Sequence, residues 1–319
     1  MKNLIDIKED NKIIKEINKV WIDLNQKQKE LKNYKYLYKK TDNFIKDFFH
    51  QEEIKNKNSN ISKLLSSIYF TTYKLYELII EFIKEKNKLP RDYQEINLNI
   101  IQKTFNDKNC KNPKENTKLL INFIKFRNSI SHTIFFKLYI FYILNKSQKE
   151  CLIDDDIKYE EIENEYKQYF INLKPLNYKE LLKDEFDYIK QKIKEIKNNE
   201  ISKTAFIESV ELSLINIYQA IVLIHFKNYN HNHIKQTIFE IEDFTKEDMK
   251  AFKFLHEFKH HTIHENRRMA DQFQKFNIIK KLIPSPEYKR NKTRQKTNQN
   301  LITLIKEFFE KLEKIENNN

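Results

Sequence analysis

Apolar residues recur every three or four positions along most of the chain, which is the spacing of one face of an α-helix. Near the start, Ile14, Ile17, Val20, Trp21 and Leu24 follow this spacing. Further helices are predicted over 61–87, from Pro113 onward, over the run TIFFKLYIFYIL at 133–144, over 178–198 and over LINIYQAIVLIHF at 214–226. The pattern therefore predicts an all-α protein.

Polar stretches separate these predicted helices. QEEIKNKNSN at 51–60 is one such break. Asn112 before Pro113, with Glu115 three residues after the asparagine, is typical of a helix start, because the asparagine can cap the first amides and proline suits the first turn. The acidic stretch ECLIDDDIKYEE at 150–161 is predicted to be a loop that leads into another helix.

The chain contains no glycine. Tight hairpins and phosphate-binding loops depend on glycine, because it reaches backbone conformations that other residues avoid. Its absence favours helices and excludes P-loops and dinucleotide-binding fingerprints. We expect asparagine, which is plentiful, to close helix C-termini in its place.

The formal net charge is +13 and the pI is about 9.3, which is typical of proteins that bind nucleic acid or acidic lipid. The abundance of Lys, Asn and Ile also indicates an AT-rich genome, so the charge permits RNA binding without requiring it. Cys110 and Cys151 lack metal-binding spacing and favour a reducing, cytoplasmic location. The N-terminus has no apolar signal core and the run at 214–226 is too short to span a bilayer, so no membrane association is expected.

The second half of the sequence resembles the first. PKENTKLLINFIKFRNSISH at 113–132 aligns without gaps with TKEDMKAFKFLHEFKHHTIH at 245–264, 132 positions later. Upstream, LYELIIEFI at 75–83 aligns with IYQAIVLIH at 217–225, at an offset of 142. The repeat predicts an internal duplication.

This duplication predicts two related helical bundles packed in pseudo-twofold fashion. The N-terminal domain is expected over 1–170, with 1–52 as additional helices, and the C-terminal domain over 180–319. The junction between them is expected around 165–185. The two repeated motif helices would then face each other across a basic cleft.

The segment FRNSISH places a cation and an imidazole five residues apart inside an otherwise apolar run. On one uninterrupted helix Arg127 and His132 would point about 140° apart, at about 100° per residue. Two arrangements would bring them together. The helix can break at Ser129 or Ser131, or a second motif can face the first across a cleft. The repeat favours the second arrangement.

These side chains suit RNA cleavage without a metal. Because histidine titrates near neutral pH, His132 can take the proton of a ribose 2′-hydroxyl or protonate the departing 5′-oxygen. Arg127 offers a fixed fork of donors that matches phosphate oxygens and stays charged. Asn128 and Ser131 can orient the ring or bind oxygens. The expected products carry 2′,3′-cyclic phosphate and 5′-hydroxyl ends.

FRNSISH resembles the Arg-x(4–6)-His signature of HEPN domains, in the variant with a polar Asn after the Arg. The helical surroundings are similar as well. The resemblance implies four- or five-helix bundles and a metal-independent endoribonuclease without a cofactor, as in toxin–antitoxin, phage-defence and CRISPR systems. HEPN domains act as dimers or tandem pairs. The implied partners are therefore RNA, a second copy of the chain, and an antitoxin or CRISPR-type defence protein.

By this resemblance the catalytic residues are Arg127, Asn128, His132, Lys259, His260 and His264. In the second copy a lysine stands where Arg is expected and a histidine where Asn is expected. Because lysine keeps the charge but loses the bidentate fork, this half-site is expected to be weakened or to serve binding alone. RNA-binding residues are expected on the basic tail and beside the first motif: Lys289, Arg290, Arg294 and Lys125.

Three alternatives stay open. The same fold with a degraded site would hold RNA or a protein without cutting it, and a buried arginine–histidine pair would merely stabilise the bundle. His256, Glu257 and His260 form an HExxH pattern typical of zinc hydrolases. His264 cannot complete that site, because it lies about 12 Å from His256 along a straight helix. Glu287 is the remaining candidate for the third ligand.

Overall fold

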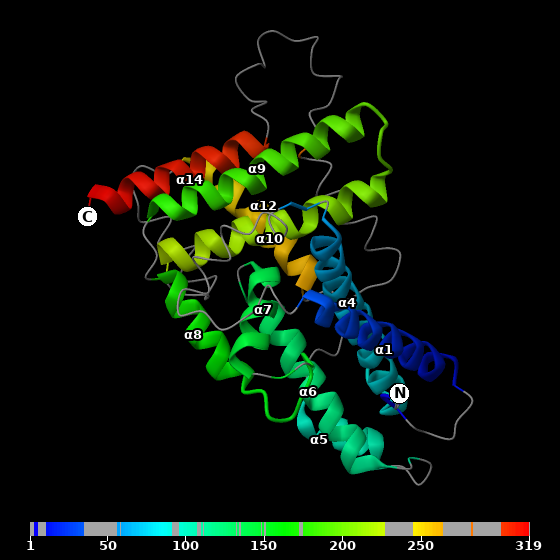
Figure 1. Ribbon diagram of the computed structural model, residues 1–319. Coiled ribbons are helices and arrows are strands. Elements are labelled where there is room, and N and C mark those ends of the chain that lie inside the picture. The colour runs from blue at the N-terminus through cyan, green and yellow to red at the C-terminus, as the bar shows by residue number, and fades with distance from the viewer. Residues whose placement is uncertain are drawn as a thin grey trace. The chain divides into compact units, whose positions relative to one another are not determined.

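The computed structural model describes residues 3–5, 11–34, 56–57, 59–90, 96–106, 110, 112–131, 133, 135–147, 149, 151–171, 175–226, 245–263, 282 and 301–318 (Figure 1). The regular elements among these residues are helices, without a strand, which confirms the predicted all-α class.

The chain divides into two compact units, 1–166 and 167–319. The first contains α1 (Lys12–Leu31), α4 (Asn60–Lys86), α5 (Leu98–Phe105), α6 (Pro113–Ser131), α7 (Phe136–Ser147) and the start of α8 (Tyr159–Ile171). The second contains the end of α8 and then α9 (Pro175–Lys197), α10 (Lys203–Phe226), α12 (Lys246–Ile263) and α14 (Leu301–Asn318).

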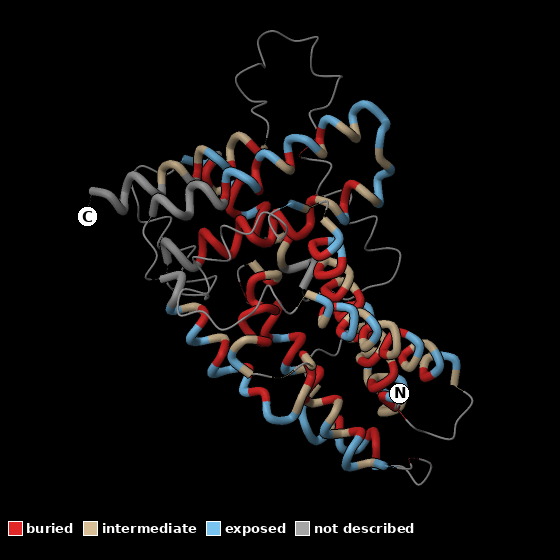
Figure 2. The backbone as a smooth tube through the Cα atoms, in the orientation of Figure 1, coloured by how far each residue is buried: buried red, intermediate tan, exposed pale blue. Residues whose placement is uncertain are grey.

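In the first unit α4 is the central helix, in contact with α1, α5, α6 and α7. Its start is capped by Ser59, whose hydroxyl accepts a hydrogen bond from the amide of Ser62 at 3.1 Å. Trp21 of α1 meets Phe123 of α6 edge to face, with ring centroids 6.5 Å apart. Residues 138–144 of α7 are buried without interruption, and α4 carries buried residues along its whole length, so these two helices lie at the core of this unit (Figure 2).

Helix ends are closed without glycine. Asn87 is the C-cap of α4 and Asn106 is the C-cap of α5, as the composition predicts, whereas the C-cap of α1 is Lys32. Among the described residues, three adopt left-handed backbone angles: Lys88 and Asn199, which follow α4 and α9, and Phe135, which precedes α7, with φ of 53°, 59° and 50°. Such angles cost a non-glycine residue on the order of 1 kcal/mol, so these turns carry a strain that glycine would relieve.

In the second unit α10 is the central helix, in contact with α9, α12 and α14. Of the described helices, it alone is long and apolar enough to cross a membrane, but most of its apolar window is buried inside the unit, as in a core helix. The start of α12 is a capping box, in which Asp248 accepts from the amide of Thr245 at 2.7 Å. Lys311 of α14 pairs with the same carboxylate at 2.6 Å and ties the two helices together.

The two units share the order and the pairing of their helices. In chain order, α1, α4, α6 and α7 correspond to α9, α10, α12 and α14. In both units the first of these helices pairs with the second, the second with the third and fourth, and the third with the fourth. Four buried positions of α6 recur as buried positions of α12: Asn116, Leu120, Phe123 and Phe126 correspond to Asp248, Phe252, Leu255 and Phe258.

Candidate functional site

The motif FRNSISH lies at the C-terminal end of α6. The helix is described as far as Ser131, and α7 begins at Phe136 after a turn in which Phe135 is left-handed. His132 lies outside the described residues. The site is therefore built from the part of the motif that α6 carries and from the side chains that α4 places against it.

Arg127 is buried, with 4% of its surface exposed, and its guanidinium lies on two tyrosine rings of α4. Its Cζ is 4.0 Å from the ring centroid of Tyr76 and 5.1 Å from that of Tyr73. The two tyrosines are three residues apart and so share one face of α4. A guanidinium on a tyrosine face is stabilised by the negative potential of the ring, which lowers the cost of burying the charge.

A chain of hydrogen bonds holds the backbone beneath this side chain. Ser131 Oγ donates to the carbonyl oxygen of Arg127 at 2.7 Å, and Tyr73 Oη lies 2.5 Å from the same Oγ. Because the single serine proton is used on the carbonyl, the tyrosine hydroxyl is the donor to Ser131. Both contacts are buried, where hydrogen bonds are least exposed to competition from water.

The polar edge of this arrangement reaches the surface at Asn128. Arg127 Nη1 donates to Asn128 Oδ1 at 3.1 Å, and Asn128 is exposed. We call Tyr73, Tyr76, Arg127, Asn128 and Ser131 the Arg127 cluster. Its chemistry is that of a fixed cation with one edge near solvent, which suits binding of a phosphate oxygen.

The second unit has a related arrangement on α10 and α12. Lys259 Nζ lies 5.9 Å from the ring centroid of Tyr218, and the ring of His256 lies 5.9 Å from the same tyrosine. At the offsets of the repeat, Tyr218 corresponds to Tyr76 and Lys259 to Arg127. Burial raises the pKa of Tyr218, so its ring contacts the lysine as a neutral phenol. The same cation-on-tyrosine contact therefore recurs in both units.

The other predicted site residues divide into two groups. Lys125 is exposed on α6. Outside the described residues lie His132, His264, Lys289, Arg290 and Arg294, and the side chain of His260 is likewise not described. Their predicted roles stay predictions.

The described residues contain no group of three or more His, Cys, Asp and Glu side chains arranged to hold a metal. Within the HExxH pattern, His256 contacts Tyr218, and Glu257 forms an ion pair with Lys253 at 3.6 Å. The zinc alternative therefore depends on the side chain of His260 and on Glu287, neither of which the structure describes.

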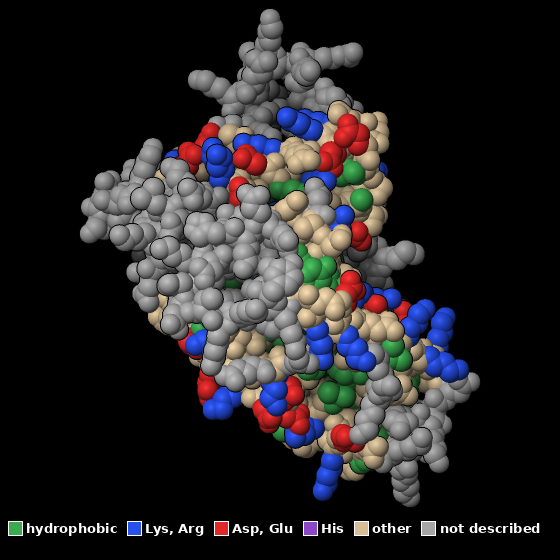
Figure 3. Space-filling view, in the orientation of Figure 1, with side chains coloured by type: hydrophobic (Ala, Val, Ile, Leu, Met, Phe, Trp, Pro, Cys, Tyr) green, Lys and Arg blue, Asp and Glu red, His purple; other side chains and the backbone are tan. Residues whose placement is uncertain are grey.

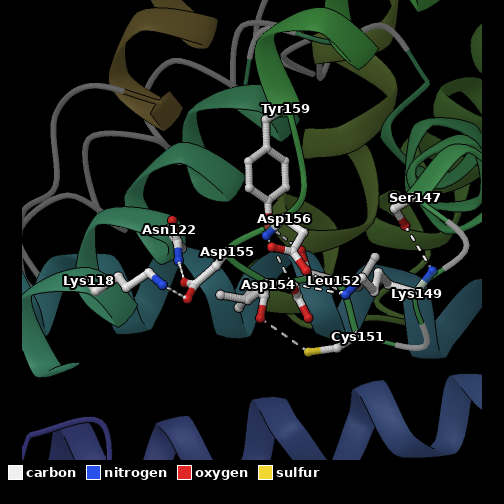
Figure 4. Close-up of polar contacts among 11 residues, drawn as sticks. Lys118, Asn122, Ser147, Lys149, Cys151, Leu152, Asp154, Asp155, Asp156 and Tyr159 are labelled. Atoms are coloured by element: carbon white, nitrogen blue, oxygen red, sulfur yellow. Dashed lines mark hydrogen bonds and ion pairs between the residues drawn. The ribbon is translucent and has the colours of Figure 1, made fainter.

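The acidic stretch after α7 forms a loop that is fastened to its surroundings (Figure 4). Asp155 pairs with Lys118 and accepts a hydrogen bond from Asn122, both on α6. Lys149 pairs with Asp156 at 2.8 Å and with Asp154 at 3.6 Å. We call residues 151–158 the acidic loop. Asp155 thus ties the loop to α6, and because all three aspartates have a lysine partner, the loop is not a free acidic site.

Reasoning from the sequence missed Tyr73 and Tyr76. Their three-residue spacing on a helix was visible in the sequence, but so many tyrosines occur in this chain that spacing alone could not select them. Their importance follows from the packing of α4 on α6, which brings together residues more than fifty positions apart.

Figure 3 shows Lys and Arg side chains interspersed with Asp and Glu on the described surface in view, without one continuous basic field. The positive net charge is therefore not concentrated on that described face. Comparisons with protein-family models, with curated proteins and with solved structures find no match for this chain, so its site is interpreted from its own geometry.

Proposed function

We propose that this protein is a metal-independent endoribonuclease built from two HEPN-like units. The observation that carries the proposal is the repeated contact between the motif cation and a tyrosine of the preceding long helix. Arg127 lies on Tyr76 in the first unit, and Lys259 lies on Tyr218 in the second. Two units that share helix order, helix pairing and this contact fit a tandem pair of related domains.

In this proposal the first unit performs the chemistry. Arg127 binds a non-bridging phosphate oxygen and stabilises the charge that develops on the phosphorus as the 2′-hydroxyl attacks. Asn128 orients the guanidinium, to which it is already hydrogen-bonded. His132 acts as the acid–base group, a role carried by the motif resemblance. The reaction consumes no water in this step and leaves a cyclic phosphate.

The second unit contributes binding. Lys259 carries the charge without the planar fork, so it suits a phosphate contact better than transition-state stabilisation. His260 and His264 complete this half-site, and Lys125, Lys289, Arg290 and Arg294 contact the RNA backbone. The proposal includes pseudo-twofold pairing of the units, a cytoplasmic location and control by a second copy or by an antitoxin-like or CRISPR-type defence protein.

The second candidate function is an RNA-binding module that does not cut. The observation in its favour is that Arg127 is 4% exposed, which is also what a purely structural arginine on two aromatic rings would show. Both functions predict RNA binding, so cleavage is the measurement that separates them.

The test is incubation of the purified chain with mixed RNA in excess EDTA. We expect cleavage to persist, because the attack of the 2′-hydroxyl and the departure of the 5′-oxygen need no metal. The new 3′ ends should resist tailing until the cyclic phosphate is removed, and the new 5′ ends should accept phosphate from a kinase directly. Arg127→Lys and His132→Ala should each lower kcat by about 100-fold or more while RNA binding remains.

His256→Ala is the matched control, because it removes a histidine of the HExxH pattern and leaves the first unit intact. It should retain cleavage. Activity that disappears in EDTA and returns with zinc would replace this proposal by the zinc hydrolase. RNA binding without cleavage under any condition would replace it by the binding module.

A further inference from the structure

We infer that Tyr73 is a positioning residue for Arg127, which it holds both at the backbone and at the guanidinium. The catalytic role of Tyr73 rests on the proposed function, but its contacts with Arg127 and Ser131 exist whether or not the protein cuts RNA. It assigns a role to a residue outside the FRNSISH motif, on a different helix.

The backbone contact is made by the tyrosine hydroxyl. Tyr73 Oη donates to Ser131 Oγ at 2.5 Å, and Ser131 Oγ donates to the Arg127 carbonyl at 2.7 Å. This path crosses from α4 to the last turn of α6 and adds a side-chain hydrogen bond at the Arg127 carbonyl. These two hydrogen bonds hold the backbone of Arg127 in place relative to α4.

The guanidinium contact is made by the tyrosine ring. Arg127 Cζ is 5.1 Å from the centroid of Tyr73 and 4.0 Å from that of Tyr76, so the planar group lies against two rings of one helix face. With the backbone and the far end of the side chain both held, the long arginine keeps one conformation. Ordering that is already present in the free protein does not have to be supplied when the transition state forms.

The second unit lacks the hydroxyl path. At the offsets of the repeat, Ile215 stands where the first unit has Tyr73, and Ile263 stands where it has Ser131. Both partners of the hydrogen bond are thus replaced together, whereas the ring contact of Tyr218 is kept. The two contacts therefore occur independently of each other. A tyrosine ring contacts the motif cation in both units, but the hydroxyl hydrogen bonds occur in the first unit, whose motif has arginine rather than lysine.

The test compares Tyr73→Phe and Tyr73→Leu with wild type. Phenylalanine keeps the ring and removes the hydroxyl path, and leucine removes both contacts. We expect kcat for RNA cleavage to fall about 10-fold in the first variant and about 100-fold in the second, with KM unchanged, because misplacing a reacting group by about 1 Å costs on this order. Each variant is assayed well below its own unfolding temperature.

The matched control is Tyr159→Phe. Tyr159 is also buried in the first unit, and its hydroxyl donates to the Leu152 carbonyl at 2.5 Å rather than to the Arg127 cluster. Its ring packs on Phe126 of α6, with ring centroids 6.1 Å apart, and phenylalanine keeps that contact while it removes only the hydroxyl. The control should lose stability to a similar degree and keep both kcat and KM. Comparing Tyr73→Phe with Tyr159→Phe therefore separates the loss of Arg127 positioning from the general effect of removing a buried hydroxyl.

A second readout does not depend on activity. The chain has six arginines, so a spectrum of protein labelled with ¹⁵N-arginine resolves the Nε–H signals, and Arg127→Lys identifies the one from Arg127. Two tyrosine rings should displace this signal from those of exposed arginines. In Tyr73→Leu it should move toward them, and in Tyr159→Phe it should stay in place.

An unchanged Arg127 signal in Tyr73→Leu would overturn the inference, as would equal losses of kcat in Tyr73→Phe and Tyr159→Phe. If the wild-type chain cleaves no RNA, the proposed function fails, and the Arg127 signal alone decides whether Tyr73 positions the guanidinium.

Discussion

Arg127 combines two properties that rarely occur in one side chain. It is as buried as a core residue, yet one guanidinium nitrogen reaches an exposed amide at Asn128. Burying a charge is expensive unless other groups replace its water, and the two tyrosine faces and the amide oxygen do so here. In the proposed reaction a phosphate would therefore approach from the Asn128 side and would meet a cation that is already partly desolvated.

The acidic loop offers a test of a single ion pair through its pH dependence. The Lys149 ammonium donates to Asp156 and holds the pKa of that carboxyl below its usual value, and Asp156 in turn raises the pKa of Lys149. A lowered pKa in the folded state contributes stability above the pKa of the unfolded chain, and this contribution is lost as pH falls through the folded value. Asp156→Asn should therefore be less stable than wild type near neutral pH and equally stable in strong acid.

The difference should be small, because both partners are exposed and solvent screens the pair. It is measured as the unfolding temperature of the two proteins between pH 2 and 8. A gap that persists unchanged at the lowest pH would show that Asp156 stabilises the loop by something other than its charge.

Among the helices, α6 is held along its whole length. Its first half meets the acidic loop through Lys118 and Asn122, and its last turn meets α4 through Tyr73. In the second unit α12 is held differently, by the pair between Asp248 and Lys311 of α14. Corresponding helices thus share their buried positions but not the polar contacts that fasten them.

This difference predicts that the second unit loses stability when Asp248 is replaced by the asparagine that the first unit has at the corresponding position. Asp248 is 4% exposed and corresponds to Asn116, so Asp248→Asn keeps the shape but removes the charge that Lys311 and the amide of Thr245 contact. We expect a loss of about 1–3 kcal/mol in the free energy of unfolding, as for hydrogen bonds to a buried charged group. The measurement is denaturant unfolding followed by circular dichroism.

Asp187→Asn on α9 is the control, because its pair with Lys190 is 3.8 Å long and about half exposed on both sides. It should cost less than about 1 kcal/mol. Equal losses in the two variants would mean that the contact between α12 and α14 does not depend on the Asp248 charge.

At the scale of the molecule, each of the two units has a buried core of its own, formed around α4 in the first and around α10 in the second. We therefore expect the fragment 1–174, which ends after α8, to fold alone. Trp21 is the single tryptophan of the chain and is 5% exposed against Phe123, so its fluorescence reports on the first unit. The fragment should show blue-shifted emission and one cooperative unfolding transition in denaturant.

The complementary fragment 175–319 contains no tryptophan, so its folding is followed by far-ultraviolet circular dichroism. Red-shifted emission and gradual unfolding of 1–174 would show that the first core needs the rest of the chain. That outcome would also weaken the interpretation of the two units as duplicated domains.

The helical class, the helix starts at Pro113 and near Asn60, and the asparagine C-caps were predictable because they depend on neighbours within one or two turns. The repeat of 113–132 at 245–264 could be found because it consists of matching residue identities in the sequence. Local spacing, capping chemistry and the absence of glycine act over short stretches of chain, and they bias each segment before any packing takes place.

The contacts of the site were not predictable in the same way. Arg127 was singled out from its motif, but its two tyrosine partners lie on a helix that ends more than 25 residues before α6 begins. The acidic loop was recognised, while its partners Lys118 and Asn122 were not. Which side chains meet across helices depends on how buried faces interlock, and that is a property of the packed core rather than of any one segment.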